Sequence, residues 1–460
     1  MPEVDLPFPR DGRMPELETA LQPRVVSALL APHASSPSGA VFEVLDCRLS
    51  RIRYRKHERC FLQYALTLRD TTTGVRHEQW LTGALFGRPG RAERRWRRAG
   101  KTAGVAYAPE LSMLLNVFPH DRKLTHAVEL ASGTDPAIRD AVLAAFGPGH
   151  WDVVSVAAVP VRYREHLSLV VRYEVTAQEA GTGTLRSKVF YAKGFPTGAD
   201  ARRGHGLLSQ LARDTSGRHV RVRVDAPLAC LPHLDALLFE ATPGTPLDTA
   251  LDDTNEVQAW ASLREAARAV ARFNGSDIAV PRAYVKADYA AWLDRPCALL
   301  AWACPELAVE LREAPSVLAE TPRNDDLRPS HRDMKPEHVL LSPNGAAFID
   351  LDSCARAEPV SDTALMLARL AARATAGGQT ERMTRYAECF ADEYFSQVPS
   401  TWKARLPVFF ACSLLEVASG IFHRQESGWE RRIRALIRLS AESATHSPND
   451  VMRLRGLDPA

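Results

Sequence analysis

The sequence predicts an α+β protein with a β-rich N-terminal half and a helical C-terminal half. From about residue 40 to about residue 250, short segments alternate apolar and polar residues between turn residues, and this period of two is typical of strands. Beyond that point apolar residues recur every three to four positions, as in amphipathic helices. One pair of short apolar runs, within 338–350, interrupts the helical part.

Composition indicates an ordinary globular protein of 460 residues, with 45% hydrophobic and 25% charged residues. The net charge of +3 does not favour a nucleic-acid partner. The eight cysteines are scattered without a Cys-x-x-Cys pair, so neither a zinc site nor a disulfide framework is expected. The N-terminus lacks the apolar core of a secretion signal, and the longest apolar stretch, 406–422, contains Glu416 and reads as a buried helix. A cytoplasmic location is expected.

The β-rich half contains an internal repeat. The segment RIRYRKHERCFLQYALTLRDTTTG aligns without gaps with PVRYREHLSLVVRYEVTAQEAGTG at an offset of 109 residues. Further on, PELSMLLNVFPHDRKL aligns with PHLDALLFEATPGTPL at an offset of 123 residues. Each copy reads as a β-hairpin, a strand, a helix and a strand ending in a turn with proline. A duplication is therefore expected, and chance similarity of short strand patterns is the alternative.

The predicted order of elements follows from these patterns. An N-terminal extension at 1–35 precedes the first copy at 36–130, and the second copy occupies 131–248. The basic run at 87–101 has only Trp96 as an aromatic residue, so a solvated helix face is expected rather than a nucleic-acid site. In the helical part, 249–460, a first helix has apolar positions from Val257 to Phe273 and stops at Asn274-Gly275. Further helices are expected at about 283–304, 361–376, 379–396, 403–422 and 427–441.

Residues 331–352, HRDMKPEHVLLSPNGAAFIDLD, carry the clearest functional signal. Asp333 lies in a polar loop, and His338 follows five residues later. Two apolar runs around a Pro-Asn-Gly turn then lead to Asp350 and Asp352. Phosphoryl transfer needs such a group, because one carboxylate orients the attacking hydroxyl and others hold Mg²⁺. The alternative is a hairpin whose exposed end merely carries acidic residues.

This block resembles the catalytic and metal loops of the protein-kinase-like fold. HRDMKPEHVLL is similar to the protein-kinase catalytic loop, but IDLDS at 349–353 stands in place of Asp-Phe-Gly. Hydrophobic-Asp-x-Asp is the pattern of the aminoglycoside phosphotransferase and choline kinase families. The next stretch, EPVSDTALMLARL, also resembles them, with Asp362 expected to cap the helix that it opens. The resemblance implies a bilobal fold with a β-rich N-lobe at 131–248, a helical C-lobe at 249–460 and a degenerate N-lobe-like copy at 36–130.

The resemblance also implies roles for the residues of the block. Asp333 corresponds to the catalytic base, and Lys335 to a contact with the γ-phosphate. Asp350 corresponds to the principal Mg²⁺ ligand. His338 stands where asparagine is usual, so it either binds the metal, binds phosphate or only packs. Asp352 either binds a second metal or hydrogen-bonds a loop.

In the second copy, the resemblance assigns Lys188, in the strand SKVFYAKGF, to the lysine that holds the α- and β-phosphates. Lys193 points to the opposite face of that strand and is expected to be solvated. Glu240 and Ala241 correspond to the linker whose backbone pairs with adenine. The first copy has Gln79 opposite Lys188, so a structural or regulatory role is expected for it.

The sequence thus predicts a cytoplasmic phosphotransferase that uses ATP and Mg²⁺ to phosphorylate a hydroxyl of a small molecule, without nucleic-acid or membrane partners. The acceptor stays open among aminoglycosides, amino alcohols, sugars and nucleosides. The alternative is a pseudokinase scaffold that binds nucleotide weakly or not at all and regulates a partner. His338 favours that alternative, as does the absence of a glutamate at 200–213 to pair with Lys188. A protein kinase is the third possibility, which the missing activation segment disfavours.

Overall fold

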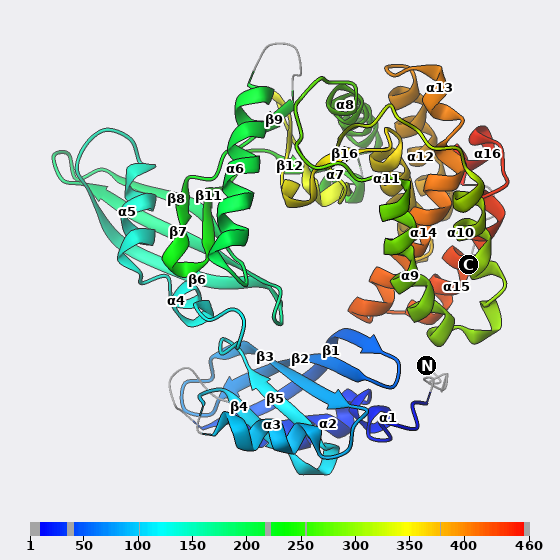
Figure 1. Cartoon of the computed structure of the whole chain (residues 1–460). Coiled ribbons are helices and arrows are strands. Elements are labelled where there is room, and N and C mark those ends of the chain that lie inside the picture. The colour runs from blue at the N-terminus through cyan, green and yellow to red at the C-terminus, as the bar shows by residue number, and fades with distance from the viewer. Residues whose placement is uncertain are drawn as a thin grey trace. The chain divides into compact units, whose positions relative to one another are not determined.

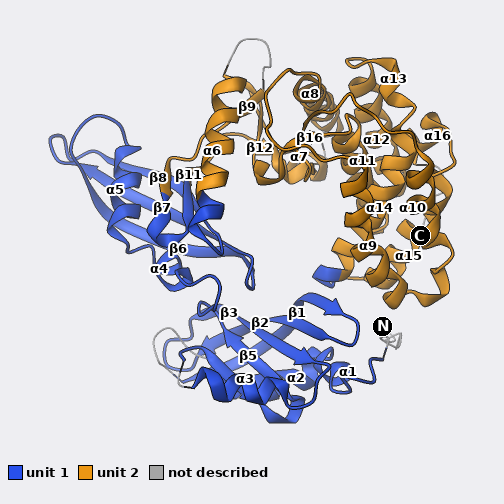
Figure 2. Ribbon diagram, in the orientation of Figure 1, with its two compact units in different colours: residues 1–201, 231–238, 423–426 blue, residues 202–230, 239–422, 427–460 orange. Residues whose placement is uncertain are grey.

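The computed structural model describes residues 10–34, 41–100, 102–216, 222–253, 255–377 and 379–454. Of the predicted extension at 1–35, residues 1–9 and 35 lie outside the described residues. The chain divides into two compact units, 1–201 with 231–238 and 423–426, and 202–230 with 239–422 and 427–460 (Figure 2). Strands dominate the first unit and helices the second (Figure 1). The predicted α+β class, with a β-rich N-terminal region and a helical C-terminal part, is confirmed.

Two five-stranded sheets form the first unit. The first sheet has the order β1-β2-β3-β5-β4, with strands Phe42–Arg55, Arg59–Asp70, Arg76–Phe86, Met113–Val117 and Val105–Ala108. The second has the order β10-β11-β8-β7-β6, with strands Ala229–Leu231, Ala236–Glu240, Leu185–Gly194, Ser168–Glu179 and Trp151–Arg164. The helices here are α1 Leu17–Ala20, α2 Pro23–Leu30, α3 Arg91–Ala99, α4 Ala127–Ser132 and α5 Pro136–Ala144. Helix α6, Gly198–Thr215, begins in this unit and lies mostly in the second.

The alternating pattern of the sequence produces a buried face on each sheet. In β2, Leu62, Tyr64, Leu66 and Leu68 point to one face and are all 0% exposed. Burying each such side chain contributes about 1.5–3 kcal/mol. The short strands β4 and β10 and the helices α4 and α5 are too short to stand out in the sequence.

The two sheets have the same strand order, since β6-β7-β8-β11-β10 repeats β1-β2-β3-β5-β4. Their first hairpins turn at His57 and His166, both left-handed with φ of 59° and 61°. In each case an aspartate from a preceding segment holds the turn. Asp11 accepts a hydrogen bond from the main-chain N of His57 (2.9 Å), and Asp121 from that of His166 (2.8 Å). The role of residues 36–130 as a degenerate N-lobe copy stays a prediction.

A buried tyrosine ties a preceding helix to each sheet. Tyr64 donates its hydroxyl to the carbonyl of Ala20 (2.6 Å), and Tyr173 donates to the carbonyl of Leu130 (2.6 Å). Residues 127–130 therefore pack with the second sheet, although the sequence boundary places them with the first copy. Residues 10–34 pack on the first sheet, because α1 and α2 cover β1 and β2.

The sheets of the first unit meet at the β6–β7 hairpin. Glu165 is 3% exposed; it accepts hydrogen bonds from Arg53 Nη2 (3.3 Å) and from Asn116 Nδ2 (2.9 Å). The ring of Tyr163 stacks on that of Trp80, with 6.0 Å between centroids. Polar and aromatic contacts together fix this junction.

Helices form most of the second unit. They are α7 Leu247–Asp252, α8 Glu256–Asn274, α9 Lys286–Ala303, α10 Glu310–Glu320, α11 Ser361–Ala374, α12 Thr380–Phe395, α13 Ser400–Lys403, α14 Leu406–Arg424, α15 Trp429–Ser443 and α16 Pro448–Met452. The helices predicted from periodicity correspond to α8, α9, α11, α12, α14 and α15. Asn255 caps α8, where its side chain accepts from the main-chain N of Gln258.

By length and composition, α14 is the one helix among the described residues that could span a membrane. In this structure 78% of its apolar window is buried inside the protein. That burial is typical of the core helix predicted from the sequence.

Two small sheets lie among these helices. One has the order β12-β14-β15-β9, with strands Thr245–Pro246, Val339–Ser342, Gly345–Phe348 and Val222–Val224. The other pairs β13, Arg328–Ser330, with β16, Ala355–Ala357. The two strands predicted within 338–350 are therefore present as β14 and β15. The two small sheets hold the loop before β14 and the segment after β15.

Candidate active site

The loop at 331–338 and the segment after β15 come together because of strand pairing. β14 and β15 form an antiparallel hairpin in which Val339 lies opposite Phe348. The chain therefore returns at residue 349 to the place from which the loop entered β14. Asp350 follows in the left-handed conformation, with a φ of 62°, which is uncommon for a residue other than glycine. Such backbone strain is concentrated at functional sites.

Three of the predicted site residues form one cluster. Asp333, His338 and Asp350 each offer a ligand atom, and these atoms lie within 4.8 Å of one another. Lys335 Nζ lies 3.5 Å from Asp333 Oδ2. Asp352 is not part of the cluster and belongs to the short 3₁₀ turn Leu351–Ser353.

His338 makes a hydrogen bond through one ring nitrogen and turns the other toward Asp350. Nδ1 lies 2.9 Å from the carbonyl oxygen of Asp333. A carbonyl only accepts, so Nδ1 carries the hydrogen and Nε2 presents its lone pair. Nε2 lies 3.4 Å from Asp350 Oδ2. Burial lowers the pKa of His338 to about 3, assisted by His331 and Lys335, so the ring is neutral.

This geometry fits a divalent cation. A lone pair that faces a carboxylate oxygen is repelled unless a cation lies between them, and a neutral imidazole whose other nitrogen donates to a carbonyl is the usual arrangement of a ligating histidine. The carboxylates of Asp333 and Asp350 supply the oxygen ligands that Mg²⁺ prefers. Of the three roles left open for His338, metal binding agrees best with its contacts.

A buried carboxylate, Asp362, anchors the loop at 331–338, which the sequence predicts to be the catalytic loop. Its Oδ2 accepts from the main-chain N of His331 (2.8 Å) and from Asn274 Nδ2 (2.9 Å). Its Oδ1 accepts from the main-chain N of Arg332 (3.0 Å). The expectation that Asp362 caps its own helix is wrong, because α11 already begins at Ser361 without a side-chain cap. In the sequence Asn274 signals only a helix end, and its role depends on tertiary contact.

His331 braces the same loop, as a buried residue with two well-defined hydrogen bonds. Its Nε2 lies 2.8 Å from the carbonyl oxygen of Ile349, and its Nδ1 accepts from the main-chain N of Asp333 at 3.3 Å. It therefore ties the catalytic loop directly to the segment that carries Asp350.

Two arginines and a half-buried glutamate, Glu416, lie near Asp333. Arg369 Nη2 lies 3.9 Å from Asp333 Oδ1. The guanidinium of Arg332 lies over the rings of Tyr284 and Tyr289, 3.8 and 4.4 Å from their centroids. Burial raises the pKa of Glu416, although Arg369 and Arg332 oppose that shift. The sequence shows Glu416 only as a polar residue in an apolar stretch, so no local pattern reveals this group.

The contacts of Lys188 do not agree with the role expected for it. Its Nζ donates to the carbonyl of Ala145 (2.7 Å) and lies 5.8 Å from the ring centroid of Phe146. Lys188 shares its face of β8 with Phe190, which is 0% exposed and contacts the ring of Phe146. That face is covered by the segment that follows α5. Lys193 lies on the opposite face, half-buried, with Nζ 5.8 Å from the ring of Phe195, so the expectation that it is simply solvated is wrong.

Glu240 is the last residue of β11, and Ala241 follows it. Strand β12 comes next, at Thr245–Pro246. The side chain of Glu240 is exposed and Ala241 is half-buried. Their assignment concerns main-chain atoms only and stays a prediction.

Comparison with known proteins places the cluster in a family. Residues 172–396 match the model of the phosphotransferase enzyme family, and no curated protein sequence matches the chain. Among solved structures, a choline/ethanolamine kinase family protein from Mesorhizobium loti is 11% identical and has a TM-score of 0.43, covering 72% of this chain and 98% of its own. The amicoumacin kinase hAmiN, in complex with AMP-PNP, Ca²⁺ and Ami, is 11% identical with a TM-score of 0.45, and the match covers 68% of this chain and 96% of that kinase. Choline kinase LicA from Streptococcus pneumoniae is 13% identical with a TM-score of 0.42, covering 67% and 98%.

The matched range contains Asp333, His338 and Asp350 together with their anchor Asp362, whereas the first sheet lies outside it. Residues 172–396 therefore resemble the phosphotransferase enzyme family, as the motifs of the sequence indicated.

Proposed function

We propose that the protein transfers the γ-phosphate of ATP to a hydroxyl group of a small molecule in the cytoplasm. The observation that carries the proposal is the convergence of Asp333, His338 and Asp350 within 4.8 Å. The family match supports a small-molecule phosphotransferase. Chemically, the acceptor oxygen forms a bond to the γ-phosphorus, the bond from that phosphorus to the β,γ-bridging oxygen breaks, and ADP leaves.

Each residue of the cluster has a defined part in this reaction. Asp333 accepts a hydrogen bond from the acceptor hydroxyl, orients it and takes its proton. Lys335, whose Nζ lies 3.5 Å from Asp333 Oδ2, binds an oxygen of the γ-phosphate. His338 Nε2 and Asp350 would hold the cation, and Mg²⁺ bound there would supply charge neutralisation for the phosphates. Asp352 is a candidate for a second cation.

The acceptor belongs to a class that the comparisons suggest. The similar structures are named as kinases of choline, ethanolamine and amicoumacin. We therefore infer that amino alcohols and amine-bearing antibiotics are the compounds to test first.

The test combines nucleotide binding with turnover. Mg-ATP at a hundredfold its dissociation constant should stabilise the wild type by about 2.7 kcal/mol. Asp350→Asn should lose most of this stabilisation, while Glu337→Gln, an exposed carboxylate of the same loop, should keep it. ADP release would then be measured against choline, ethanolamine and aminoglycosides.

Two results would contradict the proposal. Absence of a thermal shift with ATP or GTP, in Mg²⁺ or Mn²⁺, would exclude a functional nucleotide site. A shift without turnover on any hydroxyl compound would favour the pseudokinase scaffold.

A further inference from the structure

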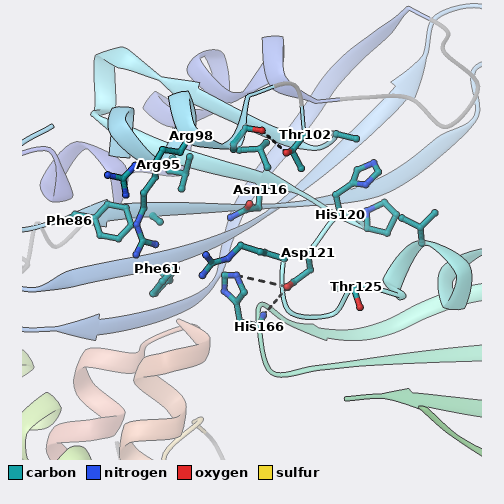
Figure 3. A pocket seen from close by; sticks show the side chains of 18 residues that line it. Phe61, Phe86, Arg95, Arg98, Thr102, Asn116, His120, Asp121, Thr125 and His166 are labelled. Atoms are coloured by element: carbon teal, nitrogen blue, oxygen red, sulfur yellow. Dashed lines mark hydrogen bonds and ion pairs between the residues drawn. The ribbon is translucent and has the colours of Figure 1, made fainter. Parts of the chain in front are cut away.

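A pocket lies in the first unit, far along the chain from the catalytic loop. It lies outside residues 172–396, which match the family model. Its volume is about 540 Å³, within the range of small-molecule sites. Strands β2, β3 and β5 form one wall, α3 forms another, and the segment around Asp121 closes it beside His166 (Figure 3). All of its lining residues come from the first unit.

Aromatic rings and arginines meet on one side of this pocket. Phe61 and Phe86 lie there beside Arg95 and Arg98 of α3 (Figure 3). The guanidinium of Arg95 lies 4.9 Å from the ring centroid of Phe86. Arg122 lines the pocket from the segment after β5. The wall therefore offers flat apolar surface together with planar, multidentate donors.

The positive charge of this wall is not balanced within the first unit. Among the described residues, no carboxylate forms an ion pair with Arg95, Arg98 or Arg122. Burial lowers the pKa of Arg95, and the neighbouring arginines 91, 122, 59 and 98 lower it further. Arg95 and Arg98 also line an adjoining hollow of about 380 Å³ whose lining consists of five arginines.

Asp121 is the acidic residue in the lining of the pocket, and its carboxylate already accepts hydrogen bonds from other groups. The carboxylate of Asp121 accepts from Tyr163 Oη (2.9 Å) and from the main-chain N of His166 (2.8 Å). It also accepts from the main-chain N of Lys123 (2.7 Å) and Leu124 (3.1 Å). With these bonds made, Asp121 holds the loop and cannot also satisfy the arginines.

We propose that this pocket binds a phosphorylated small molecule with an aromatic ring, of nucleotide size. Its phosphate groups lie against Arg95, Arg98 and Arg122, because guanidinium groups bind phosphate oxygens in a bidentate manner. Its ring lies against Phe61 and Phe86. The enclosed volume and the small net charge of the chain favour such a ligand over nucleic acid. The basic run at 87–101, expected to be only a solvated helix face, thus lines a binding site.

The experiment uses the full chain and separates this site from the catalytic one. ADP without divalent cation is titrated by calorimetry into wild type, Arg95→Ala/Arg98→Ala and the control Arg97→Ala. Arg97 lies on the same helix but pairs with Glu93 at 2.6 Å and does not line the pocket. Photolabelling with 8-azido-ADP and peptide mapping then locates the bound ring.

The expected result is labelling of peptides from β2 to β5, and an affinity that falls roughly tenfold or more in the double variant, as for loss of charge-assisted hydrogen bonds. Arg97→Ala should bind as wild type, and all three proteins should melt alike. Labelling confined to 172–396, or equal affinity of the double variant, would overturn the proposal. Tighter binding of a single-stranded RNA oligonucleotide, weakened equally by Arg97→Ala and by salt, would overturn it in favour of a nucleic-acid surface.

Discussion

At the scale of single residues, the candidate site depends on one buried carboxylate. Asp362 is 0% exposed and holds three donors, of which two are main-chain groups of the catalytic loop. A carboxylate has enough lone pairs for all three, whereas a smaller or apolar side chain leaves each donor without a partner. The position of Asp333 is therefore set through Asp362, 29 residues away in the chain.

Replacing Asp362 should cost both stability and activity. Asp362→Ala leaves three buried donors unsatisfied, so we expect a loss of roughly 3 kcal/mol or more in unfolding free energy and a large loss of turnover. Asp362→Asn keeps part of the hydrogen bonding and should lose less stability and less turnover. Urea unfolding and ADP release measure the two effects, and full turnover in Asp362→Ala would show that the loop needs no such anchor.

The two lysines of β8 should differ in their effect on nucleotide binding. We expect Lys193, on the opposite face of β8 from Lys188, to be the lysine that holds the nucleotide phosphates. Lys193→Ala should then raise the KM for ATP about tenfold or more, because that charge-assisted contact is lost. Lys188→Ala removes the hydrogen bond to the carbonyl of Ala145 and should mainly lower the melting temperature. Steady-state kinetics and thermal melting of both variants show which lysine binds phosphate and which supports the fold. A raised KM in Lys188→Ala and a lowered melting temperature in Lys193→Ala would restore the role first expected for Lys188.

These residues also show what the sequence can and cannot predict. Asp333, His338 and Asp350 lie in a single run of chain, so their spacing predicts the cluster. Lys188 and Lys193 lie on opposite faces of a strand, and alternation alone does not say which face is covered by the segment after α5. Glu416 acts through tertiary contacts that leave no local pattern.

At the scale of elements, the first hairpins of the two sheets are held by carboxylates that come from earlier in the chain. The turns at His57 and His166 adopt a left-handed conformation that is uncommon for residues other than glycine. Hydrogen bonds to Asp11 and Asp121 compensate for that strain. Propensity alone would favour glycine at both turns.

The anchor Asp11 should make stability depend on pH in the acid range. Burial alone would raise its pKa, but hydrogen bonds from Tyr54 and His57 outweigh this and lower the pKa from 3.8 to about 2. The folded state therefore binds this proton less readily than the unfolded state, and its contribution is full above about pH 4 and is lost as the pH falls toward 2. Asp11→Asn should be less stable at neutral pH and should show a shallower loss between pH 4 and 2. Asp46→Asn, an exposed residue of β1, is the control and should follow the wild type; identical slopes in all three would contradict the expectation.

At the scale of the whole molecule, the two compact units have separate cores. Leu66 is 0% exposed in the first unit, and Leu414 is 0% exposed in the second. Each unit contains many fully buried apolar side chains of its own, and single domains usually unfold cooperatively.

Calorimetry should therefore resolve two thermal transitions. Leu66→Ala should lower one midpoint and Leu414→Ala the other, each by an amount that corresponds to about 2–5 kcal/mol. Circular dichroism can assign each transition to a unit, because strands dominate one unit and helices the other. A single transition that both variants shift equally would show that the chain unfolds as one unit.

The anchors that precede each sheet have a consequence for where the chain can be divided. A fragment that begins at residue 131, the boundary suggested by the sequence, would contain every strand of the second sheet but would lack Asp121 and the carbonyl of Leu130. A fragment that begins shortly after Val117, the end of β5, would retain both. Soluble expression of the second sheet with the helical unit therefore requires the ten or so residues that come before its apparent start.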